Sequence, residues 1–212
     1  MSTRAQQRTA TALVERAGRT YADEAGITLK DTPSPLFELL VLSLLLSTRI
    51  SADIAVAAAR ELFTSDHRTP QKMADASWQD LVDALGRGHY VRYDESTATR
   101  LGDAARRVLD EYHGDLRELA DRSGHDTAQA AGLLQEFTGI GPVGADVFLR
   151  EVQDVWTWVS PYFDERALTA ASDLGLPDTP AELGSLADGR PAVLAAALVR
   201  ASLDDGLRAE LA

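Results

Sequence analysis

Apolar positions recur along this chain with helical periods, and no stretch of useful length shows the two-residue alternation of a half-buried strand. Leu36–Leu46 is apolar on nearly every side, which predicts a helix buried at the centre of a helical core. Residues 4–25 are rich in alanine with charges between, which predicts one amphipathic helix that ends at Gly26. The chain is therefore predicted to be all-α with a bundle-like core.

Capping residues and breakers place the other helices. The pattern predicts helices over 52–63, 78–85, 94–111, 116–122, 164–173 and 191–203, with a short helix after Pro70. Ser51 and Asp126 stand where N-caps are expected, and Thr32–Pro35 is predicted to be a linker.

A glycine pair in the second half of the chain carries most of the functional information. Leu133, Leu134 and Phe137 lead into Gly139-Ile140-Gly141, and a second apolar helical pattern begins at Pro142. Two glycines permit a sharp turn between helices, and proline suits the first position of the next helix. Backbone N–H groups at that helix start could bind a phosphate, with Ile140 buried beneath the turn. An ordinary turn between helices is the alternative.

Composition limits the classes of site. The chain has 212 residues, 45% apolar content and no cysteine, which excludes disulfides and Cys-ligated zinc or iron–sulfur sites. No basic-plus-apolar leader opens it, and its longest apolar run is too short to cross a bilayer. We expect a cytoplasmic protein with no membrane contact and no metal site. The net charge of −12 disfavours nucleic-acid binding in general, although local patches of the nineteen arginines can still be positive.

The glycine-pair segment resembles the hairpin of the endonuclease III and alkyladenine glycosylase (HhH-GPD) superfamily, whose pattern is roughly L-x-x-L-P-G-I/V-G-x-x-x-A. Gly139, Ile140, Gly141 and Ala145 match, and Thr138 replaces the usual proline. The resemblance extends from about Pro35 to Pro177 and implies a two-lobed helical fold. Residues 34–152 would form a helical barrel domain with the helix-hairpin-helix at about 126–153. Residues 1–33 and 153–212 would form a second lobe from both termini.

The resemblance also implies a catalytic aspartate. The family pattern V-D-T-H-I-x-R-V-x-x-R-x-G-L is similar in apolar spacing to Phe163–Leu176, and Asp164 lies 23 positions after Gly141. At a helix N-terminus a carboxylate is held ionised, and it can stabilise an oxocarbenium-like sugar or activate a water. The alternative is a plain N-cap that contributes about 1 kcal/mol.

Three departures from the family narrow the implied chemistry. The lysine that forms the Schiff base in bifunctional members is replaced by Val143, and the place of the adenine-excising glutamate, near Leu44, is apolar. The family's iron–sulfur loop is also absent, because the chain contains no cysteine to bind a cluster. These departures imply a monofunctional glycosylase without a cluster, although the hairpin carbonyls of such motifs can hold a monovalent cation.

The remaining site residues follow from the same resemblance. Arg49 takes the place of the family's glutamine, which fills the gap left by an everted nucleotide. The hairpin is expected to bind DNA through Gly139, Ile140, Gly141, Val143 and Gly144, and Arg87, His89 and Arg92 are candidates for phosphate contacts. Trp156, Trp158, Tyr162 and Tyr90 are candidates for a base pocket that stacks on a cationic base. The alternatives are solvated basic residues and aromatic core packing.

The leading hypothesis is a monomeric, monofunctional DNA glycosylase acting on duplex DNA with a damaged base. Alkylated purine is the first substrate expected, since its positive charge makes it a good leaving group, and a deaminated or mismatched pyrimidine is the second. The rival is a catalytically inactive helix-hairpin-helix protein that binds DNA structure or a protein partner. A third hypothesis is an unrelated all-α regulator in which the Gly-Ile-Gly turn arose by chance.

Overall fold

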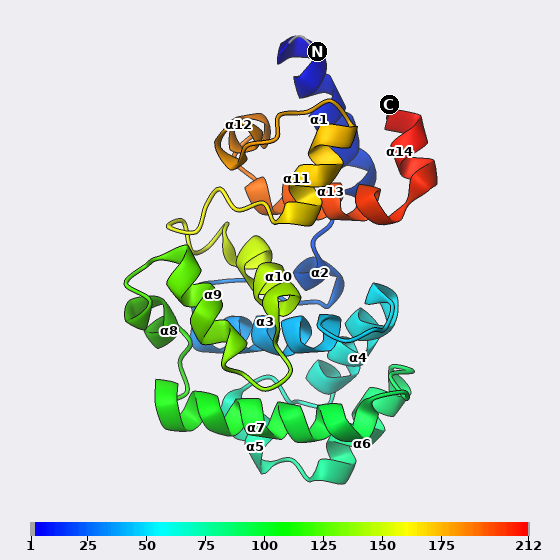
Figure 1. Cartoon of the computed structure of the whole chain (residues 1–212). Coiled ribbons are helices and arrows are strands. Elements are labelled where there is room, and N and C mark those ends of the chain that lie inside the picture. Colours follow the sequence, from blue (N-terminus) through cyan, green and yellow to red (C-terminus); the bar gives the residue numbers. More distant parts are fainter. Residues whose placement is uncertain (1–2, 212) are drawn as a thin grey trace. The chain divides into compact units, whose positions relative to one another are not determined.

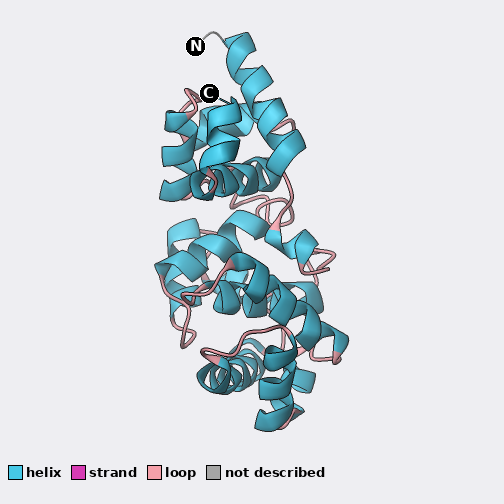
Figure 2. Cartoon of the chain, turned by 90° about the vertical axis from the view of Figure 1, so that its right-hand side faces the viewer, coloured by secondary structure: helices cyan, strands magenta, loops and turns pink. Residues whose placement is uncertain are grey.

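The computed structural model describes residues 3–211, in which helices are joined by loops and there is no strand (Figures 1 and 2). The all-α prediction is confirmed. None of the helices in this range combines the length and the apolar character that a membrane span needs.

The chain forms two compact units, which we call the terminal unit and the central unit. The terminal unit contains the described residues up to Tyr21 and those from Leu149 onward, and the central unit contains Ala22–Phe148. The divisions predicted from the sequence lie at 33/34 and 152/153, so residues 22–33 and 149–152 fall in different units from those predicted. α2 (Tyr21–Glu24) and α10 (Pro142–Val152) each cross a boundary between the units.

The central unit is built around one apolar helix. Its helices after α2 are α3 (Pro33–Leu46), α4 (Ala52–Thr64), α5 (Pro70–Asp75), α6 (Trp78–Arg87), α7 (Asp94–Tyr112), α8 (Arg117–Arg122) and α9 (Thr127–Gln135). Every residue of α3 from Leu36 to Leu45 is buried, as its uniformly apolar pattern predicts. α4 packs against α3 and α6, and α7 packs against α3, α5 and α6.

The predicted linker before α3 was wrong, whereas the predicted N-cap of α4 is confirmed in its position. Pro33 begins α3 instead of lying in a linker, because a proline in the first helical turn loses no intrahelical hydrogen bond. Ser51 occupies the N-cap position of α4, but its side chain accepts no capping hydrogen bond.

The terminal unit packs around α13 (Pro191–Leu203). α13 contacts α1 (Thr3–Ala17), α11 (Glu165–Asp173) and α14 (Asp205–Leu211), and α12 (Pro180–Leu186) packs on α1. Leu13, Leu194 and Leu198 are among the fully buried side chains of its core.

The prediction of one helix over residues 4–25 was wrong. The helix is broken after Ala17, and Tyr21 donates its backbone N–H to Glu151 Oε1 at 3.2 Å instead of to a preceding helical turn. A Cβ on Gly18 would clash first with the carbonyl oxygen of Val14 and would also lie 2.9 Å from Val193 Cγ1, so this glycine relieves crowding against the preceding turn and α13. The sequence analysis also missed α12, although Thr179-Pro180 followed by Glu182 is typical of a helix start.

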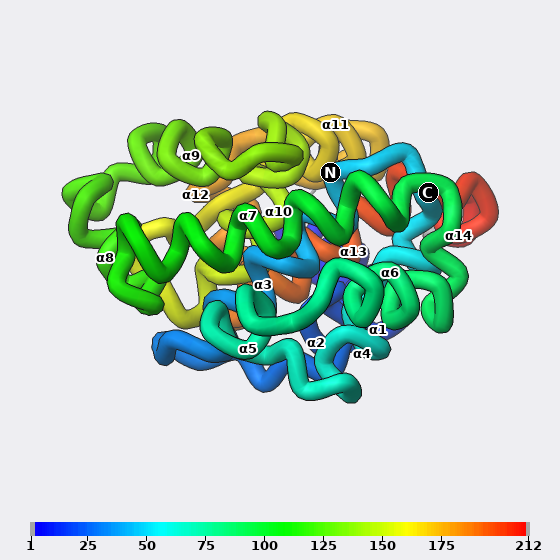
Figure 3. Tube along the Cα trace, turned by 90° about the horizontal axis from the view of Figure 1, so that it is seen from below, coloured from blue at the N-terminus to red at the C-terminus, as the bar shows by residue number. Residues whose placement is uncertain are grey.

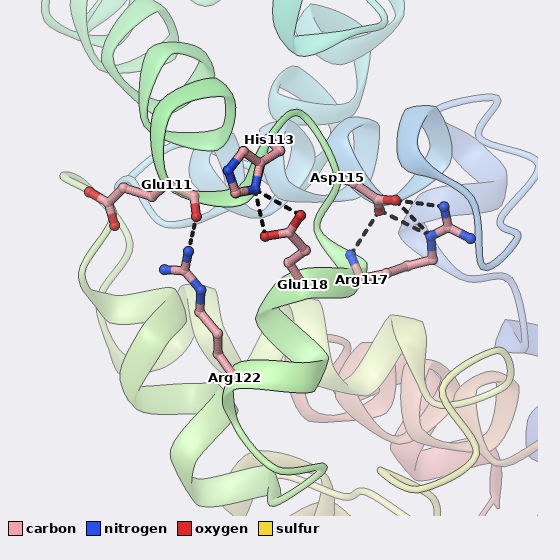
Figure 4. A network of polar contacts seen from close by, with 6 residues as sticks. All are labelled: Glu111, His113, Asp115, Arg117, Glu118 and Arg122. Atoms are coloured by element: carbon pink, nitrogen blue, oxygen red, sulfur yellow. Dashed lines mark hydrogen bonds and ion pairs between the residues drawn. The ribbon is translucent and has the colours of Figure 1, made fainter.

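A set of polar contacts closes the corner between α7 and α8 (Figure 4). His113 ends α7 in the left-handed region, with φ of +48°, and its Nδ1 lies 2.9 Å from Glu118. Arg117 Nη2 donates to Asp115 Oδ2 at 2.6 Å, a hydrogen bond that lowers the pKa of Asp115. Arg122 donates to the carbonyl of Glu111. The corner thereby sets where α8 and then α9 begin.

Glu38 is the charged residue buried within α3. Its Oε2 accepts from Arg68 Nη1 at 2.9 Å and its Oε1 from Ser34 Oγ at 3.1 Å. Burial raises the pKa of Glu38 above its ordinary value, and the charge of Arg68 and the two hydrogen bonds oppose that rise only in part.

We expect Glu38→Gln to gain stability relative to the wild type as the pH rises from about 4.5 to 7. A raised carboxyl pKa means that the folded state holds a proton that the unfolded state has lost, so wild-type stability is lost as the pH rises through the folded pKa. Each unit of pKa difference corresponds to about 1.4 kcal/mol. Urea unfolding of both proteins at both pH values measures the effect. An equal stability difference at the two pH values would contradict it.

Candidate functional site

The helix-hairpin-helix forms as its sequence predicts. Asp126 caps α9, with its Oδ1 accepting from the backbone N–H of Gln129 at 2.8 Å. Ile140 is buried and donates its backbone N–H to the carbonyl of Phe137 at 2.9 Å. Gly139 has a φ of +100°, a conformation that other residues adopt only with strain, and α10 begins two residues after Ile140, at Pro142.

The hairpin lies along α7 (Figure 3). The ring of Phe137 stacks on Tyr112 with 6.0 Å between centroids, and the guanidinium of Arg107 lies 5.3 Å from the Phe137 ring. About two turns nearer the start of α7 than Arg107, the side chain of Arg100 covers Gly139, where a Cβ would meet Arg100 Cδ at 2.8 Å. The turn therefore runs along α7 toward its N-terminus.

The first turn of α10 touches the end of α3. Gly144 is buried, and a Cβ placed on it would lie 2.1 Å from Ser47 Oγ and 3.1 Å from Ile140 Cγ2. Ser47 Oγ is itself bound, since it donates to the carbonyl of Ser43 at 2.6 Å. Gly144 thus packs two helices together, whereas the neighbouring Val143 is 61% exposed.

The bend after α3 carries Arg49 and rests on Tyr90. The Tyr90 hydroxyl lies 2.6 Å from Thr48 Oγ1 and 3.4 Å from the carbonyl of Leu45, and Tyr90 is fully buried. Tyr90 therefore supports the bend from inside the central unit, without an open face of its ring. Arg49 is exposed on that bend and makes no ion pair within residues 3–211.

The three other polar candidates of this region differ in their surroundings. Arg87 Nε lies 3.0 Å from Glu61 Oε2, and its Nη2 donates to Ser65 Oγ at 2.6 Å, so its guanidinium is held at the end of α4. His89 is exposed, with a φ of +63°. Arg92 is exposed, and its guanidinium lies 5.3 Å from the ring centroid of Tyr93.

Asp164 is the N-cap of α11 in the terminal unit. Its Oδ1 accepts from the backbone N–H of Ala167 at 2.9 Å, as the capping alternative of the sequence analysis requires. Its Oδ2 accepts from Arg150 Nη1, and the two side chains are only 6% and 3% exposed. Both carboxylate oxygens are therefore engaged, and Arg150 Nε has no hydrogen-bond partner among the described residues.

The aromatic candidates precede Asp164 in the same unit. Trp156 is buried and stacks on Trp158, with 5.3 Å between ring centroids. The backbone of Tyr162 is held by Gln153, whose Nε2 donates to its carbonyl at 2.9 Å and whose Oε1 accepts its N–H at 2.7 Å. Trp158 and Tyr162 are partly exposed.

Two arginines of this region escaped the sequence analysis. Arg150 directly follows the apolar residues 147–149 of α10, and a charge beside such a run is rarely buried unless it is paired. Arg100 lies in a helix with many charges, and nothing in its neighbourhood in the sequence indicates that it covers the hairpin.

No protein-family model and no curated protein matches this chain. Among solved structures, it is similar to one of endonuclease III in a trapped covalent intermediate with DNA, described as an estranged-adenine complex. The identity is 13% and the TM-score 0.48, over 91% of this chain and 84% of the other. A likeness of this size identifies neither a substrate nor a reaction.

We expect Gly144→Ala to destabilise the protein, because its Cβ displaces Ser47 Oγ from the carbonyl of Ser43. Overpacking costs about 1–3 kcal/mol, which exceeds the gain in helix propensity of up to about 1 kcal/mol. Gly141→Ala is the control, since nothing lies within 4 Å of a Cβ there. Urea unfolding compares both variants, and Gly144→Ala should cost less in a Ser47→Ala background. Equal costs in the two backgrounds would contradict the contact.

We also expect Asp164→Asn to lower the free energy of unfolding by about 3–5 kcal/mol, because Arg150 is then a buried charge without its counter-charge. The amide still caps α11, so the loss isolates the ion pair. Asp126→Asn is the matched control at an exposed N-cap and should change stability by less than about 0.5 kcal/mol. Similar losses in the two variants would show that Arg150 does not depend on Asp164.

Proposed function

We propose that this protein is a monofunctional DNA glycosylase that binds duplex DNA through its hairpin and uses Asp164 as the catalytic carboxylate. The proposed DNA binding rests on the accessible N-terminus of α10. Nothing lies within 4 Å of a Cβ on Gly141, and α10 is an 11-residue helix whose first N–H groups have no helical partner. A phosphate oxygen can therefore approach the backbone closely and accept from these groups.

Arg49 supports a role in holding the duplex open. It is exposed at a bend that Tyr90 and Thr48 fix from beneath, and it forms no ion pair within the described residues. A guanidinium can stack and donate hydrogen bonds at once, which suits an orphan base opposite an everted nucleotide.

The surroundings of Asp164 hold its carboxylate in a defined position, between the backbone N–H of Ala167 at the start of α11 and the guanidinium of Arg150. A carboxylate beside the sugar stabilises positive charge there as the base leaves, so one carboxylate suffices when the leaving group is good. Alkylated purines satisfy this condition, and Trp158 and Tyr162 are partly exposed aromatic residues that can stack on a cationic base.

Val143 supports hydrolysis without strand cleavage. It occupies the position at which the bifunctional enzymes of the resembled family carry a lysine, and its exposed, apolar side chain cannot form an imine. Lys72 is engaged with Asp66, with 2.6 Å between Nζ and Oδ2.

One observation favours the second candidate function, a protein that binds DNA without catalysis. Asp164 uses one oxygen to cap α11 and the other to pair with Arg150. A carboxylate occupied in this way must release or share an oxygen before it can face a sugar. A purely structural role for Asp164 needs no such step.

Base release from duplexes that contain a methylated purine tests the proposal. We expect the wild type to generate abasic sites that hot alkali converts to breaks, with no breaks before alkali. Since Asp164→Asn is expected to be unstable, the matched variant is Arg150→Gln with Asp164→Asn, which removes both charges of the pair. We expect this double variant to fold, which its thermal unfolding checks, and to release no base.

Three outcomes separate the hypotheses. Release by the folded double variant at the wild-type rate would remove Asp164 from the mechanism. Salt-dependent DNA binding by the wild type without release from alkylated, deaminated or mismatched duplexes would establish the second candidate. Absence of both binding and release would overturn the proposed function.

A further inference from the structure

We infer that Arg100 is a phosphate-binding residue that extends the hairpin's DNA contact onto α7. The inference rests on the proposed DNA binding by the hairpin and assigns a new residue to it. It is based on two features of Arg100 within the central unit: the side chain lies beside the hairpin turn, and its charge has no counter-charge.

Arg100 lies directly on the turn. A Cβ on Gly139 would meet Arg100 Cδ at 2.8 Å, Nε at 3.5 Å and Nη1 at 3.6 Å, so the outer part of the side chain runs over the glycine. The absence of a side chain at position 139 therefore makes room for the arginine as well as for the backbone turn. The guanidinium is consequently held beside the hairpin backbone that the proposal assigns to a phosphate.

The charge of Arg100 is left without a partner, unlike that of its neighbours on α7. Arg107, on the same face two turns further on, pairs with Glu111 and Glu136. Arg106 pairs with Asp103 at 2.7 Å. Arg100 forms no ion pair and no hydrogen bond with any residue of the described range, and its side chain is partly exposed.

Two further unpaired arginines are linked to the same hairpin by contacts within the central unit. Arg49 lies two residues after Ser47, which packs against Gly144. Arg92 lies two residues after Tyr90, whose hydroxyl is hydrogen-bonded to Thr48. Neither Arg49 nor Arg92 is ion-paired within residues 3–211.

Acidic residues occur on the neighbouring elements, and they reduce the net charge of this region without binding the three arginines. Asp53 lies in the first turn of α4, and Asp94 and Glu95 lie in that of α7. In a chain with a net charge of −12, these arginines have no counter-charge among the described residues, and Arg100 lies beside the hairpin turn, so its guanidinium can bind a DNA phosphate there.

The salt dependence of binding tests the inference, with a duplex carrying an abasic-site analogue as the ligand. Each phosphate contact contributes about 0.9 to the slope of log K against log salt. We expect Arg100→Ala to reduce the slope by about that amount, so that its disadvantage against the wild type narrows by about 3.5-fold between 50 and 200 mM salt. Arg106→Ala is the matched control on the same helix and should leave the slope unchanged.

A second substitution separates charge from packing on Gly139. Arg100→Lys keeps the charge and should retain most of the slope, whereas Arg100→Gln keeps most of the length and should lose it. Thermal unfolding of each variant checks that the hairpin is still folded. An unchanged slope in Arg100→Ala, while Gly141→Ala weakens binding, would overturn the inference and leave the proposed function standing. A wild type that binds no duplex would overturn the proposed function itself.

Discussion

The central unit depends on the close approach of α10 to the end of α3 at Gly144. Backbone without a side chain meets Ser47 there, and this contact fixes where the hairpin turn lies. The apolar helix α3 provides the rigid base, since its residues from Leu36 to Leu45 are all buried. The turn is fixed from a second side by the stacking of Phe137 on Tyr112. Helix-start N–H groups are useful for binding only when their direction is fixed, and these contacts fix it.

The terminal unit holds a different constraint, the buried pair of Arg150 and Asp164. A buried ion pair contributes little net stability compared with apolar residues, but it makes each partner necessary to the other. We therefore expect the same carboxylate that the proposed chemistry uses to stabilise the fold as long as Arg150 is present. A loss of activity on changing Asp164 has meaning only beside a measurement of stability, and removing both charges together separates the two effects.

The distribution of charge resolves the apparent conflict between an acidic chain and a nucleic-acid ligand. Several arginines of the described range form ion pairs, such as Arg87 with Glu61 and Arg107 with Glu136. Arg49, Arg92 and Arg100 form none. Affinity for phosphate depends on the local field and on screening over about 8–10 Å, so the net charge of the whole chain is a poor guide to it.

The sequence by itself determined the helical class, the buried helix α3 and the hairpin turn. These depend on local properties: helical periodicity, the caps at Asp126 and Asp164, and two glycines around Ile140. It could not determine which side chains at the turn are accessible, because exposure depends on elements distant in the chain. Only the tertiary structure decided that Gly144 and Tyr90 are buried, that Arg87 is paired and that Arg100 covers Gly139.

The same division explains Asp164. Its place at a helix start was predicted from the residues around it, because a cap is a contact between near neighbours. Its pairing with Arg150 joins α10 to the N-terminus of α11, and no spacing rule predicts which charge an aspartate will meet across such a loop. The sequence determined the elements of this protein, and the tertiary structure decided which of its charges are already bound and which remain free for a ligand.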